Sequence, residues 1–186
     1  FFQHQHPGRS GLGGAASEVN VIGIVGWKNS GKTTLAAALI RELSGRGLTV
    51  SSIKHAHHMV DVDQPGTDSY KHREAGAREV ILAGGQRIAI MHELRGAGEP
   101  SLEDLLARLS PCDWVVVEGY KTHAHPKIEV HRQESGRSPL YREDANIIAV
   151  ASDYAADFSG PLFDINDVTG IADFIIDHVQ PPARES

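Results

Sequence analysis

Residues 26–33 read Gly-Trp-Lys-Asn-Ser-Gly-Lys-Thr, which is a complete G-x-x-x-x-G-K-[ST] pattern, the signature of a phosphate-binding loop. The apolar run 19–25 comes directly before it and predicts a strand. Residues 33–43 follow it and predict a helix, because Leu35, Leu39 and Leu43 recur at helical spacing. A strand, this loop and a helix in that order indicate a protein that binds a nucleoside triphosphate.

Elementary chemistry assigns roles within the loop. Gly26 and Gly31 permit a tight turn that lets backbone N–H groups approach phosphate oxygens at a helix N-terminus. We expect Lys32 to bind the β- and γ-phosphates and Thr33 to bind Mg²⁺. Lys28 either lies in solvent or reaches the γ-phosphate. The other loop residues predicted to contact the nucleotide are Asn29, Ser30 and Thr34.

Length and composition favour one domain. The chain has 186 residues, of which 40% are hydrophobic, enough for one packed core. We expect a single nucleotide-binding domain over residues 19–180. Residues 1–18 are interpreted as a leader that is disordered or derived from an expression vector, and residues 181–186 as a C-terminal tail.

Charge, cysteine usage and hydropathy narrow the class of protein. The formal net charge of -6 and the lack of a clustered basic run argue against nucleic acid as the main partner. The single cysteine, Cys112, cannot form an internal disulfide, which favours a reducing cytoplasm. No apolar stretch approaches the length that spans a bilayer, so no membrane partner is expected.

Strand and helix patterns alternate along the rest of the chain. Residues 48–54, 113–117, 127–132 and 146–151 predict strands, and the unbroken apolar run 114–117 is typical of a parallel strand in the centre of a sheet. Helices are expected near 67–76, from 102 onward with Ser101 as its cap, and at 168–179, and a β-hairpin is expected over 78–91. This order predicts an α/β fold, a three-layer α/β/α P-loop NTPase with a mostly parallel central sheet.

Glu118 ends the 113–117 strand at the sheet edge that also carries the phosphate loop. A carboxylate there either holds Mg²⁺ through water and positions the attacking water, or pairs with a backbone amide. Lys32 and Glu118 are the candidate catalytic residues, and Thr33, Glu118 and Asp63 are the candidate metal ligands.

The segment after the second strand is rich in histidine and aspartate. His55, His57 and His58 suit zinc or a soft transition metal in type, but no cysteine joins them. We favour a segment that meets the γ-phosphate or the magnesium ion through Asp61 or Asp63.

Two further groups of residues are candidates for ligand contacts. Asp153 follows a buried strand and either accepts hydrogen bonds from a guanine base or caps the next turn. Arg132, Arg137 and Arg142 form either an anion clamp or part of a solvated loop.

Several motifs together resemble the MobB family of molybdopterin-guanine dinucleotide biosynthesis adapter proteins. The resemblance runs from about Val21 to His178. Its marks are residues 26–34, 53–55, 57–58, 61–63, 65–69, 75–77, 117–121, 148–153 and 164–168. One departure stands out, since a lysine is common in the family where this chain has Thr67.

The resemblance implies a cytoplasmic, homodimeric GTP-binding protein with weak GTPase activity. It implies GTP and Mg²⁺ as cofactors and a MobA-like guanylyltransferase and the molybdopterin cofactor as partners. Gly31, Lys32 and Thr33 match as phosphate and magnesium contacts, Glu118 as the second nucleotide motif, and residues 55–68 as a functional loop.

Two other functions use the same phosphate loop. A small-molecule kinase would employ Arg132, Arg137 and Arg142 as a lid. A nucleotide-driven metal chaperone would use His55, His57 and His58 as its delivery site.

Overall fold

The computed structural model describes residues 19–56 and 62–181, which divide into two compact units. Unit 1 comprises Phe1–His55 and Ala107–Ser186, and unit 2 comprises Ala56–Leu106. The expected leader and all but one residue of the expected tail lie outside the described residues. The interpretation of residues 19–180 as one domain stays a prediction, and each unit is described by itself.

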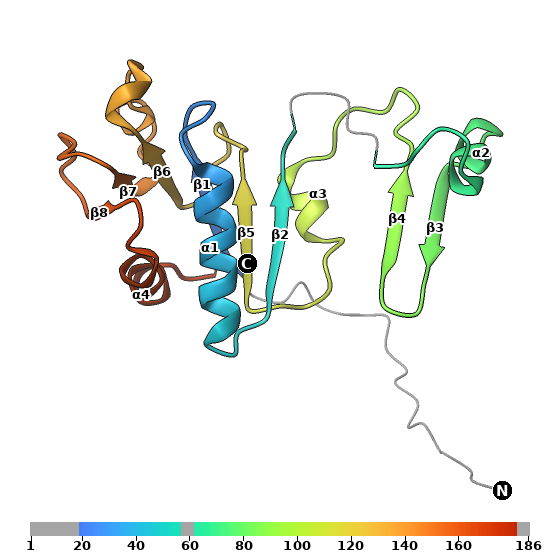
Figure 1. Ribbon diagram of the computed structural model, residues 1–186, viewed down its shortest axis with the longest axis horizontal. Coiled ribbons are helices and arrows are strands. Elements are labelled where there is room, and N and C mark those ends of the chain that lie inside the picture. The colour runs from blue at the N-terminus through green and yellow to red at the C-terminus, as the bar shows by residue number, and fades with distance from the viewer. Residues whose placement is uncertain (1–18, 57–61, 182–186) are drawn as a thin grey trace, which may run out of the picture. The chain divides into compact units, whose positions relative to one another are not determined.

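Unit 1 is built on a six-stranded parallel sheet (Figure 1), with strand order β2-β5-β1-β6-β7-β8. Every neighbouring pair of strands is parallel, which confirms the predicted fold class. The strands are β1 (Asn20–Val25), β2 (Val50–Lys54), β5 (Trp114–Glu118), β6 (Lys127–His131), β7 (Ile147–Ser152) and β8 (Leu162–Asp164). The short edge strand β8 has no counterpart in the sequence prediction, since three residues after a proline, two of them exposed, give too little pattern.

Helices α1 (Lys32–Gly45) and α4 (Val168–His178) pack on one face of this sheet. Leu35, Leu39 and Leu43 of α1 are buried there, as their spacing predicts. Asp167 begins α4 by accepting a hydrogen bond from the Gly170 backbone at 3.0 Å. These helices cover the side chains of alternate strand residues, so the main apolar core lies between them and the sheet.

The opposite face of the unit 1 sheet carries turns and two 3₁₀ helices, η1 (Gln133–Ser135) and η2 (Leu140–Arg142). Leu140 and Tyr141 pack against Val25 and Val150. Among the described residues of unit 1, this layer therefore takes the place of a second layer of α-helices. Strand β6 turns its alternate polar residues toward this face, and all three are buried: Lys127, Glu129 and His131.

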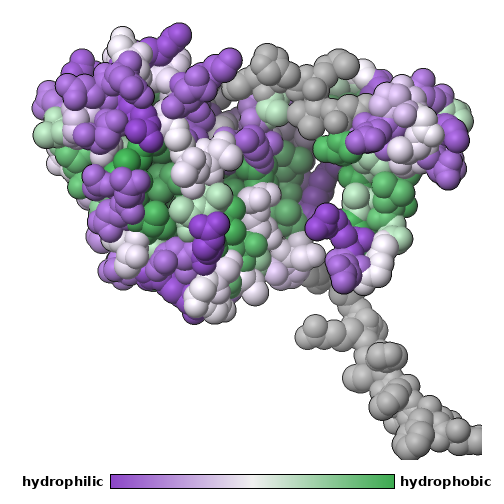
Figure 2. Space-filling model, viewed as in Figure 1, coloured by the Kyte–Doolittle hydropathy of each residue, from purple (hydrophilic) through white to green (hydrophobic). Residues whose placement is uncertain are grey.

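Unit 2 contains the predicted hairpin, an antiparallel pair of β3 (Glu79–Ala83) and β4 (Ile88–His92). It also contains α2 (Asp68–Glu74) and α3 (Leu102–Leu106). The Thr67 hydroxyl caps α2 by accepting a hydrogen bond from Tyr70 N. Figure 2 shows hydrophobic side chains at the surface of the hairpin, where Ile81, Ile88 and Ile90 are each at least 60% exposed.

No helix in residues 19–56 and 62–181 is long and apolar enough to cross a membrane.

Candidate functional site

The loop of residues 26–33 connects β1 to α1 and needs glycine at both ends of its turn. Gly26 has φ 148° and Gly31 has φ 101°, conformations that L side chains rarely adopt. A Cβ on Gly26 would also overlap the carbonyl oxygen of Val130. Asn29, with φ 64°, takes the left-handed conformation that asparagine tolerates best after glycine. Gly31 has no side chain with which to cap α1, so the first-turn N–H groups of that helix suit an anion.

Lys32 begins α1 and holds its ammonium group against the loop. Its Nζ donates a hydrogen bond to the carbonyl oxygen of Trp27 at 2.7 Å. Burial and the nearby Lys121 lower the pKa of Lys32, although Glu118 opposes this shift. An ammonium group in such surroundings gains free energy from a bound anion.

Ser30 Oγ is a second polar group turned inward at the loop. The residue is only 3% exposed, and this hydroxyl has no hydrogen-bond partner among the described residues. Buried polar atoms of folded proteins nearly always have a partner. The loop therefore fits a ligand that supplies one, and phosphate oxygens match this requirement.

Thr33 and Glu118 meet beside the loop, as their expected roles require. Thr33 Oγ1 donates a hydrogen bond to Glu118 Oε1 at 2.7 Å. Register places Glu118 beside both Ile24 of β1 and Lys54 of β2. A hydroxyl and a carboxylate are the hard oxygen ligands that Mg²⁺ prefers, so these residues fit the expected metal ion.

Lys54 is a residue of this group to which the sequence prediction gave no role. Its Nζ lies 3.3 Å from Glu118 Oε2 and donates to Thr33 Oγ1 at 3.3 Å. The sequence signal that could have identified Lys54 was its position as the last residue of a strand that ends at the same sheet edge as Glu118. Lys54 balances the charge of the carboxylate at this edge.

Three other predicted nucleotide contacts lie on the surface. Lys28, Asn29 and Thr34 are exposed. Lys28 makes no ion pair with the described part of the chain, so both interpretations of it stay open.

Asp153 has partners within the protein. Its carboxylate accepts hydrogen bonds from Gln133 N at 3.0 Å and from Arg132 Nη1 at 3.4 Å. Arg132 Nε in turn donates to the carbonyl oxygen of Ser30 at 3.1 Å. Asp153 is thus connected to the Gly26–Thr33 loop through Arg132, and its role in base recognition stays a prediction.

The three arginines grouped by sequence have separate surroundings. Arg132 makes the contacts above, whereas the guanidinium of Arg137 lies 4.9 Å from the centre of the Trp27 ring. Lys121 Nζ lies 4.5 Å from the same ring. Arg142 is exposed. Sequence reasoning missed Trp27 and Lys121, although an aromatic residue inside a phosphate loop was a visible signal.

The histidine- and aspartate-rich segment is only partly described. His57, His58 and Asp61 lie outside the described residues. The His55 ring lies 4.8 Å from that of Tyr120, centre to centre. No group of three or more His, Cys, Asp or Glu residues in the described ranges could hold a metal ion.

Asp63 belongs to unit 2 and is held there by several polar side chains. Its Oδ1 accepts hydrogen bonds from Thr67 Oγ1 and Ser69 Oγ, both at 2.9 Å, and Arg73 lies 3.3 Å from Oδ2. Burial alone would raise the pKa of Asp63, but these contacts lower it. Asp63 helps to organise the start of α2, and its role as a metal ligand stays a prediction.

A protein-family comparison decides the relationship that these features suggest. Residues 21–153 match the model of MobB, described as molybdopterin guanine dinucleotide synthesis protein B. The chain belongs to the MobB family. The matched range contains the Gly26–Thr33 loop, Glu118 and Asp153.

Individual relatives of this MobB family member agree with that assignment. The chain is 41% identical over 165 residues to the molybdopterin-guanine dinucleotide biosynthesis adapter protein of Escherichia coli, covering 87% of this chain and 94% of the relative. It is 44% identical over 162 residues to the protein of the same name from Haemophilus influenzae, covering 86% and 89%.

Solved structures of the family share its fold. A crystal structure of molybdopterin-guanine biosynthesis protein B matches with a TM-score of 0.68 and 28% identity, over 84% of this chain and 98% of the other. A MobB protein homologue from Bacillus stearothermophilus matches with a TM-score of 0.65 and 27% identity, over 86% and 97%.

Proposed function

We propose that this chain is a GTP-binding adapter that assists the guanylyltransferase step of molybdopterin guanine dinucleotide biosynthesis and hydrolyses GTP slowly. The observation that carries the proposal is the hydrogen bond between Thr33 and Glu118 beside a glycine-rich loop, in a chain of the MobB family. This arrangement supports nucleotide binding, and the family supports the pathway.

Each polar group of the loop has a separate task in this proposal. The backbone N–H groups and Lys32 bind the β- and γ-phosphates, and Ser30 Oγ gains the hydrogen-bond partner that it lacks among the described residues. Thr33 and Glu118 hold Mg²⁺, which neutralises charge on the phosphates when bound. Lys54 pairs with the Glu118 carboxylate at 3.3 Å and helps to hold it in place.

We expect slow hydrolysis because the described residues supply few groups that could act on a reacting γ-phosphate. Arg132 donates to the Ser30 carbonyl oxygen and pairs with Asp153, and Arg137 lies on the Trp27 ring, so both guanidinium groups already have partners within the protein. Glu118 remains to orient water or to act on it through the metal. The absence of an arginine at the transferring phosphate costs several orders of magnitude in rate in related systems.

The adapter role requires a partner enzyme, which we propose to be a MobA-like guanylyltransferase that holds the molybdopterin cofactor. We further propose that the protein is a cytoplasmic homodimer. The exposed face of the β3–β4 hairpin supports self-association, because the paired Ile81 and Ile90 leave apolar area in water.

Reconstitution with a MobA-like guanylyltransferase, GTP, Mg²⁺ and molybdopterin tests the proposal. We expect the chain to raise the rate or yield of dinucleotide formation. Thr33→Ala loses this stimulation because it removes a magnesium ligand, whereas Thr33→Ser retains the hydroxyl and the stimulation. Equal product formation with and without the chain would contradict the adapter role.

A further inference from the structure

The ammonium group of Lys54 contacts both of the residues that the proposed function assigns to Mg²⁺. Its Nζ lies 3.3 Å from Glu118 Oε2 and donates a hydrogen bond to Thr33 Oγ1 at 3.3 Å. Thr33 Oγ1 donates its own hydrogen to Glu118 Oε1 at 2.7 Å. The three side chains therefore form a closed triangle, in which one ammonium group stands beside a hydroxyl oxygen and a carboxylate oxygen.

A metal ion at this site would use the same oxygen atoms. A hydroxyl group has one hydrogen to donate and two lone pairs to accept with. The hydrogen of Thr33 is directed at Glu118, so the contact with Lys54 takes one of the lone pairs. Mg²⁺ binds through oxygen lone pairs, and its two charges repel a neighbouring ammonium group. A magnesium ion held by Thr33 and Glu118 therefore excludes Lys54 from its present contacts.

The two members of the ion pair differ in their freedom to move. The Lys54 side chain is 58% exposed, whereas that of Glu118 is 13% exposed. The sheet fixes both backbones, since Lys54 and Glu118 are register partners in β2 and β5 and His55 N donates to the carbonyl oxygen of Glu118 at 2.9 Å. Lys54 can therefore leave by rotation of its own side chain, while Glu118 stays at the sheet edge.

The turn after Glu118 adds to this fixation. Gly119 has φ 99° and Tyr120 has φ 52°, and a left-handed conformation is an outlier for an aromatic residue. The Tyr120 ring lies 4.8 Å from the ring of His55 and 4.9 Å from that of His123, centre to centre. Local strain of this kind persists only where surrounding contacts hold it. The contacts of this turn thus keep Glu118 in position when its cation changes.

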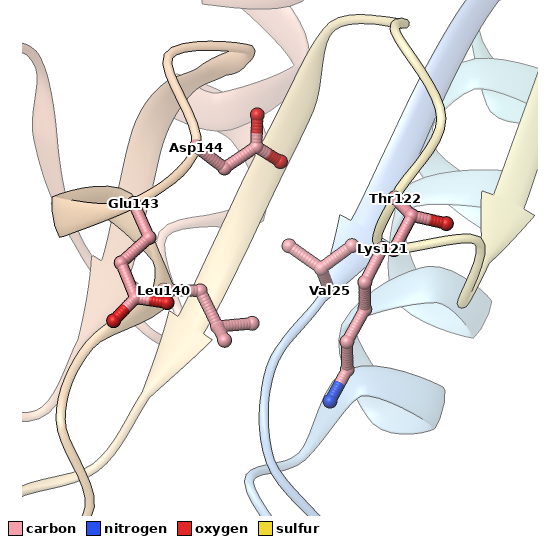
Figure 3. Close-up of a pocket in the computed structure, with 6 residues that line it drawn as sticks. All are labelled: Val25, Lys121, Thr122, Leu140, Glu143 and Asp144. Carbon is pink, nitrogen blue, oxygen red and sulfur yellow. The ribbon is translucent and has the colours of Figure 1, made fainter.

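Two other lysines lie near the site, and each is held elsewhere. Lys32 Nζ donates to the carbonyl oxygen of Trp27 at 2.7 Å, and Lys121 Nζ lies 4.5 Å from the centre of the Trp27 ring. Figure 3 shows the Lys121 side chain beside Val25, where both line a cavity of about 350 Å³. Of these three lysines, Lys54 is the one that touches the proposed metal ligands.

Repulsion from the other lysines favours a phosphate as the next partner of Lys54. Burial, Lys121 and Lys54 lower the pKa of Lys32, whereas Glu118 raises it. When a metal ion takes Glu118, Lys54 loses its carboxylate but keeps its neighbouring cations. A phosphate group that arrives with the metal restores an anionic partner, and charge-assisted contacts of this kind are strong.

We propose that Lys54 is an exchangeable counter-cation, which competes with Mg²⁺ for Thr33 and Glu118 and then binds a phosphate of the nucleotide that arrives with the metal. The protein without nucleotide holds Mg²⁺ weakly, because an ammonium group already neutralises the carboxylate. Lys54 thereby couples metal binding to nucleotide binding. The inference rests on the proposed function, because it concerns the metal and the phosphates of that site.

The first arm of the test measures metal binding without nucleotide. The probe is Mn²⁺, which takes the same oxygen ligands as Mg²⁺ and is followed by electron paramagnetic resonance. We expect Lys54→Met to bind Mn²⁺ about tenfold more tightly than the parent or better, since one competing charge-assisted contact is gone. Lys54→Arg retains a cation and the weak binding of the parent. Arg41→Met removes an exposed charge from α1 and leaves the metal affinity unchanged.

The second arm measures the binding of inorganic triphosphate in the presence of Mg²⁺ by calorimetry. Lys54→Met weakens this binding about tenfold or more, the loss typical of one charge-assisted contact. The same substitution thus shifts the two affinities in opposite directions, which the loss of a merely structural ion pair would not do. Lys54→Gln, whose amide can still donate to Glu118, gives the same two changes and serves if the methionine variant does not fold.

Two results would overturn the exchange. If Lys54→Met leaves the Mn²⁺ affinity unchanged or lowers it, the ammonium group does not compete with the metal. If triphosphate affinity does not fall, the ammonium group does not pass to a phosphate. The proposed function survives either result when Thr33→Ala still weakens the magnesium-dependent binding of triphosphate. If triphosphate binding is indifferent to both Mg²⁺ and Thr33→Ala, the proposed function itself fails.

Discussion

Thr33 Oγ1 lies 2.7 Å from Glu118 Oε1, although 85 positions separate the two residues in the chain. The sheet produces this contact, because β1 and β5 are adjacent and parallel and so deliver the Gly26–Thr33 loop and Glu118 to one edge. The proposed magnesium-dependent nucleotide site uses both groups at that edge.

Glu118→Gln is expected to lower kcat for GTP hydrolysis more than it lowers affinity for GTP. A carboxylate that acts on magnesium or water contributes most as charge develops in the transition state. Steady-state hydrolysis and calorimetry of the same preparations measure the two effects. An unchanged kcat in the variant would count against this role of Glu118. Fast turnover by the parent protein alone would contradict the proposed slow hydrolysis.

Lys32→Ala is expected to weaken GTP binding by about tenfold or more, because a charge-assisted contact contributes about 1.5–3 kcal/mol. Lys28→Ala is the control variant in the same loop. It causes a smaller loss of GTP affinity if Lys28 lies in solvent. Nucleotide titrations of folded variants measure both. A Lys32 variant that binds as the parent does would show that the phosphates lie elsewhere.

Asp144→Asn is expected to lower the free energy of unfolding by about 3 kcal/mol, since it leaves the buried Lys127 ammonium without its carboxylate. Asp157→Asn, an exposed carboxylate elsewhere in unit 1, is the control. Thermal or denaturant unfolding measures both variants.

The ion pair between Lys127 and Asp144 also predicts how the stability of the protein changes with pH. Burial alone would raise the pKa of Asp144, but the hydrogen bonds from Lys127 and Asn146 lower it. A lowered carboxyl pKa gives stability that is present above the unfolded pKa of about 4 and lost as pH falls below it. A parent protein and an Asp144→Asn variant with identical acid unfolding curves would contradict this account.

The hairpin of unit 2 gives a prediction about self-association. Ile81→Glu places a charge on the exposed apolar face and is expected to convert the proposed dimer to monomer. Ile176→Glu, on α4 of unit 1 and also exposed, leaves the assembly unchanged. Sedimentation analysis of both variants decides the matter, and a dimer that survives Ile81→Glu would exclude this face as its interface.

The parts of the fold that follow from local pattern were predictable from the sequence. Apolar runs and alternating strand-forming residues predicted every strand of the main sheet except β8. The loop motif and the end of the 113–117 strand predicted that Thr33 and Glu118 lie at the same sheet edge. Local sequence also predicted the hairpin, because two β-rich runs flank Gly84 and Gly85, and the structure confirms it.

Other features depend on tertiary contacts that no local pattern reveals. The alternation of β6 is typical of a half-exposed strand, yet Lys127, Glu129 and His131 are buried because the segment that includes η2 covers them. Trp27, Lys121 and Arg137 come together from three separate loops, so only the folded chain makes them neighbours.

Calorimetry with GTP and ATP tests most directly the proposed magnesium-dependent recognition of GTP by this protein. The parent protein is expected to bind GTP more tightly than ATP in the presence of Mg²⁺, and chelation of the metal weakens binding. Thr33→Ala weakens GTP binding mainly when Mg²⁺ is present. Equal or tighter binding of ATP would contradict the guanine assignment, and GTP binding that ignores both Mg²⁺ and Thr33→Ala would contradict the site itself.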